Sequence, residues 1–335
     1  MSAVLISDPT LRDGSHAVRH QLTEEQMRGY MLIADAAGIP IVEVGHGNGL
    51  GASSLQLGES LVSDPDMIRL AAATLRRAKI GIHVIPGVAT LHDLKSALDL
   101  GVHVVRVASH CTEADITKKH IEYVRSMGRE AYGVLMMSHM APVEALVQEA
   151  AKMQSYGAQG VILMDSAGVY LPRDVTERVR ALAAALEIPV GFHAHNNLGH
   201  AVANSVAAVD AGASILDGTI RGFGAGAGNA QLEVLVAVLD KLGYATHIDV
   251  EKLLDGANLA EQTIIAKVPT INSTSVVSGL AGVFSGFAQP VERLSRKYNV
   301  SPHRVFLELG RRKIVAGQED IIIEVVHEIA ASTAH

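Results

Sequence analysis

The sequence predicts an α/β protein: a closed (β/α)8 barrel, or TIM barrel, followed by a smaller helical C-terminal domain. Eight short, apolar, β-branched runs are each followed by a polar or glycine-rich corner and then a helical segment. Their spacing is mostly 24 to 30 residues, about one strand–helix unit. The runs cover residues 4–8, 41–46, 80–86, 104–110, 132–139, 160–166, 189–195 and 215–220. Eight such units predict a closed barrel.

The segments between the runs have helical periodicity. Residues 141–158 and 198–213 carry apolar side chains at three- and four-residue steps, and the first of these segments reaches Gly157 near its end. No hairpin turn joins neighbouring runs, which indicates parallel strands. A doubly wound open sheet is the alternative. We expect extra loop structure in residues 9–40, between the first two runs.

The strand–helix alternation stops after residue 245. The later sequence is mostly helical in pattern, and only residues 321–326 could be either helix or strand. We therefore predict a catalytic barrel over residues 1–264 and a docked helical domain over 265–335.

Composition narrows the class of protein. The 335 residues are 48% hydrophobic and 19% charged, enough for a large core, and Trp is absent. The net charge of −7 and the lack of a basic stripe argue against a nucleic-acid partner. No apolar stretch approaches the roughly 20 residues of a membrane span. With a single Cys and no signal-peptide pattern, we expect a soluble cytoplasmic protein.

Polar side chains stand at the carboxyl end of nearly every predicted strand, where barrels of this kind form their sites. In strand order they are Asp8, Arg12, Asp13 and His16; Glu43 and His46; Arg106, Ser109 and His110; Ser138 and His139; Asp165 and Ser166; His193, His195 and Asn196; and Asp217 and Thr219. Strand ends that served only packing would not need histidines and carboxylates. Because such residues occur at the ends of so many predicted strands, we expect an active site there.

Two histidines end the seventh predicted strand in "GFHAHNN" (191–197). Residues i and i+2 of a strand share a face, so His193 and His195 project together. In a closed barrel the first, seventh and eighth strands are neighbours, so Asp13 can reach the same point. One carboxylate and two imidazoles suit a divalent metal such as Mn²⁺, Co²⁺, Fe²⁺, Mg²⁺ or Zn²⁺. The alternative is two buried histidines bonded to backbone.

Two other sequence features are weaker indications of function. The glycine-rich segment "GFGAGAGNA" (222–230) resembles a phosphate cradle, but a tight turn that gives backbone clearance beside the site is favoured. Cys111 follows His110, and a Cys–His nucleophile would need both side chains on one side. Adjacent residues normally point apart, which argues against a catalytic thiol.

Several motifs resemble the 4-hydroxy-2-oxovalerate aldolase family over nearly the whole chain. They include "LRDGSHAVRHQ" (11–21), "EVGHGNGLGASS" (43–54), "GFHAHNN" and "AGQED" (316–320). The resemblance implies a TIM barrel with a helical C-terminal domain that contacts an acylating aldehyde dehydrogenase. It also implies a Mn²⁺-dependent aldolase that cleaves 4-hydroxy-2-oxoacids to pyruvate and an aldehyde, with Co²⁺ or another divalent metal as a substitute.

The same resemblance implies roles for particular residues. Asp13, His193 and His195 match the metal ligands, Arg12 the enolate stabiliser and His16 the general base. The side chains expected to line the substrate pocket are Arg12, Asp13, Ser166, His193 and Phe284.

Two positions depart from the family pattern. The family carries a Tyr where "VFSGFAQPVE" (283–292) has Phe284, and a His where it has Pro290. The pocket should be more apolar there, so an aldolase retuned to a bulkier or aromatic aldehyde, or to 2-oxobutyrate, is one alternative. Others are an acyl-CoA lyase or Claisen synthase, disfavoured by Ser15 and His16 after the Arg-Asp-Gly motif, and a non-catalytic partner subunit of a dehydrogenase.

Overall fold

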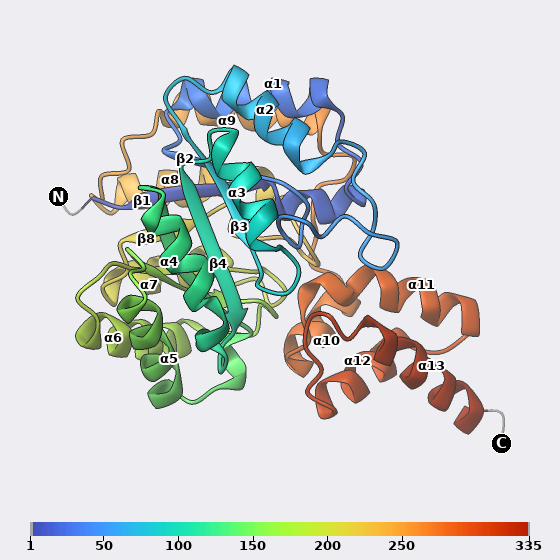
Figure 1. The fold of residues 1–335 in the computed structure, drawn as a ribbon. Helices are drawn as coiled ribbons and strands as arrows, with labels where there is room; N and C mark the ends of the chain where they lie inside the picture. Colours follow the sequence, from blue (N-terminus) through green and yellow to red (C-terminus); the bar gives the residue numbers. More distant parts are fainter. Residues whose placement is uncertain (1–2, 334–335) are drawn as a thin grey trace.

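The computed structural model describes residues 3–333, and in this part of the chain eight parallel strands close a barrel in the order β1 to β8 (Figure 1). The predicted barrel is therefore confirmed, and the open sheet is not formed. The strands are β1 Leu5–Leu11, β2 Ile41–Val44, β3 Lys79–Val84, β4 Val104–His110, β5 Glu130–Met136, β6 Val161–Asp165, β7 Val190–Ala194 and β8 Ile215–Asp217.

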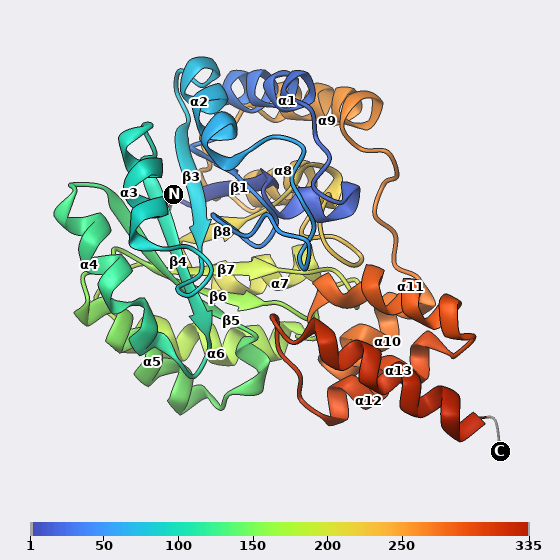
Figure 2. The same cartoon turned by 45° about the vertical axis from the view of Figure 1, so that its right-hand side comes forward.

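Helices surround the barrel and bury one apolar face each. They are α1 Glu24–Ala37, α2 Asp64–Thr74, α3 Leu91–Asp99, α4 Lys118–Ser126, α5 Val143–Ser155, α6 Pro172–Ala185, α7 Ala201–Asp210, α8 Leu232–Lys241 and α9 Val250–Thr263. The start of α1 is set by a capping box, in which Thr23 and Gln26 satisfy each other's backbone N–H groups. In both views α9 lies beside α1 (Figures 1 and 2).

Closure of the barrel brings the two ends of the repeat together. Strand β1 pairs with β8 through Leu5–Ile215 and Ser7–Asp217, and β7 also pairs with β8. Residues that follow β1 therefore lie beside residues that follow β7, although about 180 positions separate them in sequence.

Strand β1 ends at Leu11, three residues beyond the predicted end at residue 8. Its register against β2 shifts between Asp8 and Leu11, next to Pro9, and the backbone N–H of Arg12 donates to the Pro9 carbonyl at 3.0 Å. Irregularities of this kind re-aim the side chains that follow them. Arg12 and Asp13 are thereby directed into the mouth of the barrel.

The loops at the mouth contain short 3₁₀ segments that the sequence pattern did not separate from the strands. These segments are η1 Asp13–Val18, η2 Ala114–Thr117, η3 Ser138–Met140 and η4 Ile220–Gly222. The expected extra structure after the first strand is η1, but the longer irregular connection is residues 45–63, between β2 and α2. This connection packs against the residues that follow η1, through a hydrogen bond from the Leu61 N–H to the His20 carbonyl.

The C-terminal region is helical and has its own core. It contains α10 Ser273–Ala281, η5 Ser285–Phe287, α11 Ala288–Tyr298, α12 Pro302–Arg311 and α13 Glu319–Thr333. Residues 321–326 are helical because Ile322, Val325 and Val326 fall on one face of α13 and join that core. The predicted domain boundary between residues 264 and 265 stays a prediction.

The C-terminal region packs at the mouth of the barrel, beside the carboxyl ends of the strands (Figure 2). Hydrogen bonds from residues 282–289 join it to loops that follow three different strands. The pairs are His139 Nε2 with the Gly282 carbonyl at 3.0 Å, the Ser285 N–H with the Ser166 carbonyl at 3.0 Å, and Gln289 Nε2 with the His16 carbonyl at 2.9 Å. The C-terminal region therefore forms one wall of the mouth.

Within residues 3–333, none of the helices combines the length and the apolar character needed to cross a bilayer.

The burial of His139 at the junction with the C-terminal region predicts a pH dependence of stability. Burial lowers the pKa of His139 to about 4, whereas an unfolded His titrates near 6.5. Between these values the unfolded state binds more protons, so this contribution is complete above pH 6.5 and is lost as the pH falls toward 4. His139→Gln keeps an amide donor but does not titrate. Urea unfolding at pH 7.5 and pH 5 should show a pH-dependent loss smaller than wild type by about 1–2 kcal/mol.

The exposed His303 provides the control. His303→Gln should reproduce the wild-type difference between the two pH values. An equal loss in wild type and His139→Gln would contradict this account of His139.

Candidate active site

A layer of ionisable side chains fills the barrel interior near its carboxyl end, where a structural barrel would carry apolar ones. Below it lies an apolar cluster that includes Ile41, Val104, Ile162 and Ile215. The ionisable layer consists of Glu43 on β2, His83 on β3, Arg106 on β4, His193 on β7 and Asp217 on β8, all at most 3% exposed. Buried charge is costly unless it is paired, so this layer marks a functional site.

Asp13, His193 and His195 converge as predicted. One potential ligand atom from each lies within 4.8 Å of the others, and all three side chains are buried. His193 Nε2 and His195 Nδ1 have no hydrogen-bond partner among the described residues, although both are buried. Such orphaned nitrogens beside a carboxylate fit the ligand set of a divalent transition metal. The alternative of two histidines satisfied by backbone is not what the structure shows.

The glycine-rich segment 222–230 supports Asp13. Asn229 Nδ2 donates to Asp13 Oδ2 at 2.6 Å, and the Ala225 N–H donates to the same oxygen at 3.4 Å. A Cβ on Gly224 would lie 2.6 Å from that oxygen, so only glycine allows this approach. The segment is therefore the tight turn favoured from the sequence, and it fixes one carboxylate oxygen of Asp13.

The guanidinium of Arg12 is held on two sides and free on the third. Its Nε donates to Glu43 Oε2 at 3.1 Å, and its NH1 donates to Asp13 Oδ1 at 3.0 Å and to the Gly47 carbonyl at 3.3 Å. Its NH2 is buried and has no partner in the described part of the chain. An unpartnered donor of a fixed guanidinium can bind an oxyanion.

His16 lies against the loop after β2 and forms a cluster of imidazole rings with His20 and His46. Its ring meets that of His20 edge-on at 5.1 Å, and His20 stacks on His46 at 3.6 Å. A Cβ on Gly47 would overlap the His16 ring, so the loop approaches this imidazole closely. His16 is thereby confined beside Asp13 and Arg12, whose charges both act on it.

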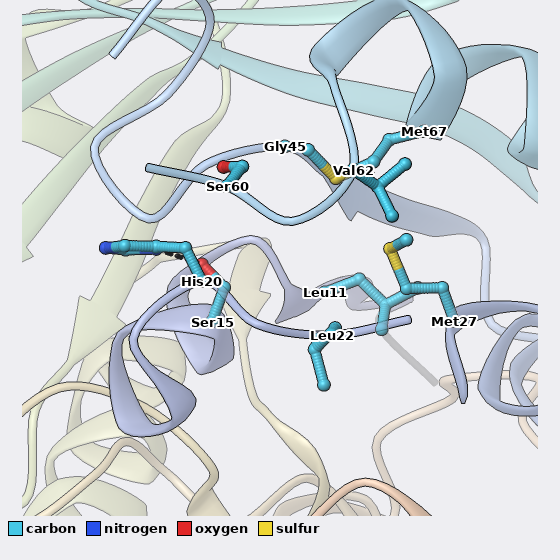
Figure 3. A pocket seen from close by; sticks show the side chains of 9 residues that line it. All are labelled: Leu11, Ser15, His20, Leu22, Met27, Gly45, Ser60, Val62 and Met67. Carbon is cyan, nitrogen blue, oxygen red and sulfur yellow. Dashed lines mark hydrogen bonds between the residues drawn. The ribbon is translucent and has the colours of Figure 1, made fainter. Parts of the chain in front are cut away.

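Behind η1 lies a cavity of about 10 Å³, room for about one water molecule (Figure 3). Ser15 and His20 line one side of it, and Ser15 Oγ is hydrogen-bonded to His20 Nδ1 at 2.9 Å. Leu11, Met27 and Met67 close the other side. The cavity is too small for an organic substrate, so it is not the substrate pocket.

The surroundings of Asp13, His16 and His195 shift the pKa values of all three side chains. Burial opposes the charge of Asp13, but Arg12 and the neighbouring histidines outweigh it and hold the pKa of this carboxyl well below its usual range. Burial lowers the pKa of His195 to about 3. Burial also lowers the pKa of His16, against the opposing effect of Asp13. At neutral pH Asp13 is therefore ionised, and both imidazoles can offer a lone pair.

Two predicted pocket residues lie at the junction with the C-terminal region. Ser166 is buried, and its Oγ accepts from the Met137 N–H at 2.9 Å while its carbonyl accepts from Ser285. The half-buried ring of Phe284 packs edge-on against Phe287 at 5.6 Å. Substrate contact by Ser166 and Phe284 stays a prediction.

Three further residues lie at or beside the site although the sequence pattern did not predict them there: His20, His83 and Asn229. His83 stands opposite Arg106 in the β3–β4 register, and the inward-facing alternation of that strand could have revealed it. His20 and Asn229 are brought to the site by loops, for which no periodic signal exists. Asp8, which the sequence placed at a strand end, instead accepts hydrogen bonds from Tyr30 of α1 and from Thr10.

Cys111 is not set up as a nucleophile. The thiol is fully buried, and burial raises its pKa to about 12. Its sulfur donates to the Met137 carbonyl at 3.3 Å. A thiol with a raised pKa is a poor nucleophile, in agreement with the expectation from sequence.

Comparison with known proteins agrees with this geometry. Residues 3–260 match the HMGL-like family, and residues 269–331 match the DmpG-like communication domain. The carboxyl transferase domain of Rhizobium etli pyruvate carboxylase has the same fold, with a TM-score of 0.83 at 14% identity, over 98% of this chain and 61% of that one. The barrel and its site thus define an enzyme of the HMGL-like class, a carbon–carbon lyase.

Curated relatives narrow the assignment. The 4-hydroxy-2-oxovalerate aldolase of Spirochaeta aurantia is 61% identical over 98% of this chain and 96% of its own length. The protein of the same name from Pectobacterium atrosepticum is 58% identical over the same shares. The chain belongs to the 4-hydroxy-2-oxovalerate aldolase family, as its motifs had indicated.

If Asp13, His193 and His195 hold a metal ion, substitutions at these positions should weaken metal binding. Asp13→Asn and His195→Ala should each weaken Mn²⁺ binding by more than about tenfold, since even changes outside the ligand shell typically cost 10–100-fold. Metal content after equilibration with Mn²⁺ and gel filtration measures this. His92→Ala, at an exposed position on α3, is the matched control. Wild-type metal content in both site variants would refute the ligand assignment.

Proposed function

We propose that this chain is a divalent-metal-dependent class II aldolase that cleaves or forms a 4-hydroxy-2-oxoacid from pyruvate, or a related 2-oxoacid, and an aldehyde. The observation that carries the proposal is the convergence of Asp13, His193 and His195 beside the unpartnered NH2 of Arg12. Metal ligands and a fixed cation at one point are what an enolate requires.

Asp13, His193 and His195 would hold the ion, and Mn²⁺ or Co²⁺ suits their mixed oxygen and nitrogen donors. When bound, the ion supplies a Lewis acid that polarises the 2-oxo group of the substrate. Asp217 accepts from His193 Nδ1 at 2.8 Å, which leaves Nε2 of that ring as the ligand atom.

The chain's own residues would then carry the proton and the developing charge. His16, neutral at physiological pH, takes the proton of the C4 hydroxyl as general base. The C3–C4 bond breaks, the C4 oxygen becomes the aldehyde carbonyl, and the electron pair of the broken bond moves into the enolate. Arg12 NH2 donates to the enolate oxygen. Return of a proton to C3 gives the 2-oxoacid, and in the opposite direction the same groups promote condensation.

The C-terminal region supports a proposal for a partner. Its residues 269–331 match a communication domain, and it forms a wall of the barrel mouth through Gly282, Ser285 and Gln289. An acylating aldehyde dehydrogenase docked on this region would take up the aldehyde close to where it is released.

Phe284 supports a narrower second candidate. Its ring has no hydroxyl, and it packs with Phe287 in the segment that meets the barrel mouth. An apolar side chain there favours a larger or aromatic aldehyde, or 2-oxobutyrate in place of pyruvate.

A condensation screen tests both candidates. The protein loaded with Mn²⁺ or Co²⁺ is incubated with pyruvate or 2-oxobutyrate and aldehydes from acetaldehyde to benzaldehyde, and products are identified by mass. We expect a 4-hydroxy-2-oxoacid with pyruvate. Strict preference for acetaldehyde would eliminate the retuned version. Absence of any aldol product with either metal would eliminate the aldolase itself.

The assignment of Arg12 makes a separate prediction. Arg12→Ala should lower kcat by about 10²–10³-fold, the usual loss of a donor at developing charge, while the protein still binds metal. The kcat of Arg12→Lys should lie between those of the wild type and Arg12→Ala. An ammonium keeps the positive charge but cannot bond Glu43 and the substrate in the fork geometry of a guanidinium. Steady-state kinetics with matched metal content measures both variants. Unchanged turnover in Arg12→Ala would show that Arg12 does not stabilise the enolate.

A further inference from the structure

Arg106 crosses the interior of the barrel and joins carboxylates on two other strands. It lies on β4 and is 2% exposed. Its NH1 bonds Glu43 Oε1 on β2, and its NH2 donates to Asp217 Oδ2 on β8 at 2.6 Å. Only a long, planar side chain with several donors can make both contacts at once.

Asp217 connects Arg106 to the metal ligands. The same oxygen, Oδ2, accepts from Arg106 and from His193 Nδ1, the latter at 2.8 Å. The carboxylate therefore fixes the tautomer and the plane of the imidazole, and it directs the unpartnered Nε2 toward Asp13 and His195.

Glu43 connects Arg106 to the opposite side of the site. Its Oε1 accepts hydrogen bonds from Arg106 NH1 and from the hydroxyl of Ser7, the latter at 3.2 Å. Its Oε2 accepts from Arg12 Nε at 3.1 Å. With Nε bound there and NH1 bound to Asp13, the guanidinium of Arg12 has one orientation. Its free NH2 is thereby directed into the site.

We propose that Arg106 is a positioning residue: through Asp217 it orients the metal ligand His193, and through Glu43 it orients the oxyanion donor Arg12. It thus keeps the two halves of the site at a fixed separation. The inference rests on the proposed function for the roles of His193 and Arg12.

The energetics of burial favour this role over a purely structural one. Glu43 and Asp217 are at most 1% exposed, and burying two carboxylates and a guanidinium costs more than packing apolar side chains of the same size. The layer below, with Val104 on the same strand, shows that this barrel packs apolar side chains where no function intervenes. Fixed geometry at the mouth is what the buried charges provide.

The test uses Arg106→Met, Arg106→Lys, Glu43→Gln and Asp217→Asn in the full chain. The last two keep side-chain shape and remain informative if Arg106→Met fails to fold. The control is Arg312→Met, because Arg312 also joins carboxylates, Glu308 and Glu324, but in the C-terminal region. For each apo protein, circular dichroism checks the fold and calorimetric titration with Mn²⁺ gives Kd. Steady-state kinetics at saturating Mn²⁺ then gives kcat and KM.

The contact through Asp217 and the contact through Glu43 predict different effects on metal affinity and turnover. Asp217→Asn should weaken Mn²⁺ binding by about 10–100-fold, as for other groups that orient a ligating histidine. Glu43→Gln should leave Kd within about threefold and lower kcat by about 10-fold or more, because an oxyanion donor is misplaced. Arg106→Met should show both losses, and Arg106→Lys should recover part of them. Arg312→Met should match wild type in Kd and kcat.

Folded Arg106→Met with wild-type Kd and kcat, even if less stable, would overturn the proposal. So would Glu43→Gln that weakens Mn²⁺ binding as much as Asp217→Asn does. Wild-type protein that binds Mn²⁺ but condenses no 2-oxoacid with an aldehyde would instead refute the proposed function. In that case the Mn²⁺ affinities of the variants still decide whether Arg106 orients His193.

Discussion

Closure of the barrel between β1 and β8 is the constraint on which the site depends. A strand near the start of the chain pairs with one that begins at residue 215, and β7 pairs on the other side. Asp13 can meet His193 and His195 only because this pairing exists. The bulged end of β1 then turns Arg12 and Asp13 inward. Chain topology sets which residues can meet, and local backbone irregularity sets where they point.

Electrostatics explains how the barrel tolerates this concentration of buried charge. Asp13 and the two carboxylates of the interior layer each have cationic or hydrogen-bonding partners. These are Arg12 and Asn229 for Asp13, Arg12 and Arg106 for Glu43, and Arg106 and His193 for Asp217. Several buried polar atoms of the site have no hydrogen-bond partner among residues 3–333, among them Arg12 NH2, His193 Nε2 and His195 Nδ1, although such atoms also occur elsewhere in the described chain. Unsatisfied buried groups are costly, so their concentration at one point is itself a sign of a ligand.

The sequence predicted the periodic part of this structure. The alternation of strands and helices and the spacing of His193 and His195 are periodic patterns that can be recognised in the sequence. The barrel and the convergence of Asp13 with the two histidines could therefore be predicted from them. Loop contacts carry no such periodicity. The contact of Asn229 with Asp13 and the stacking of His20 on His46 depend on turns whose conformation only the fold determines. Glu43, Arg106 and Asp217 were noticed as polar strand ends, but which of them pair across the barrel depends on side-chain length and on the position of each strand around the ring.

The hydrogen bonds between residues 282–289 and the barrel mouth make the C-terminal region part of the enclosure of the site. Without it, the carbonyls of His16 and Ser166 would lose their partners and the mouth would open to water. Water admitted there would weaken every charge interaction within, because screening rises with the local dielectric. The protein thus has a roof made from a segment that is remote in sequence. Swapping C-terminal regions between relatives would therefore transfer part of the reaction chamber as well as any docking surface.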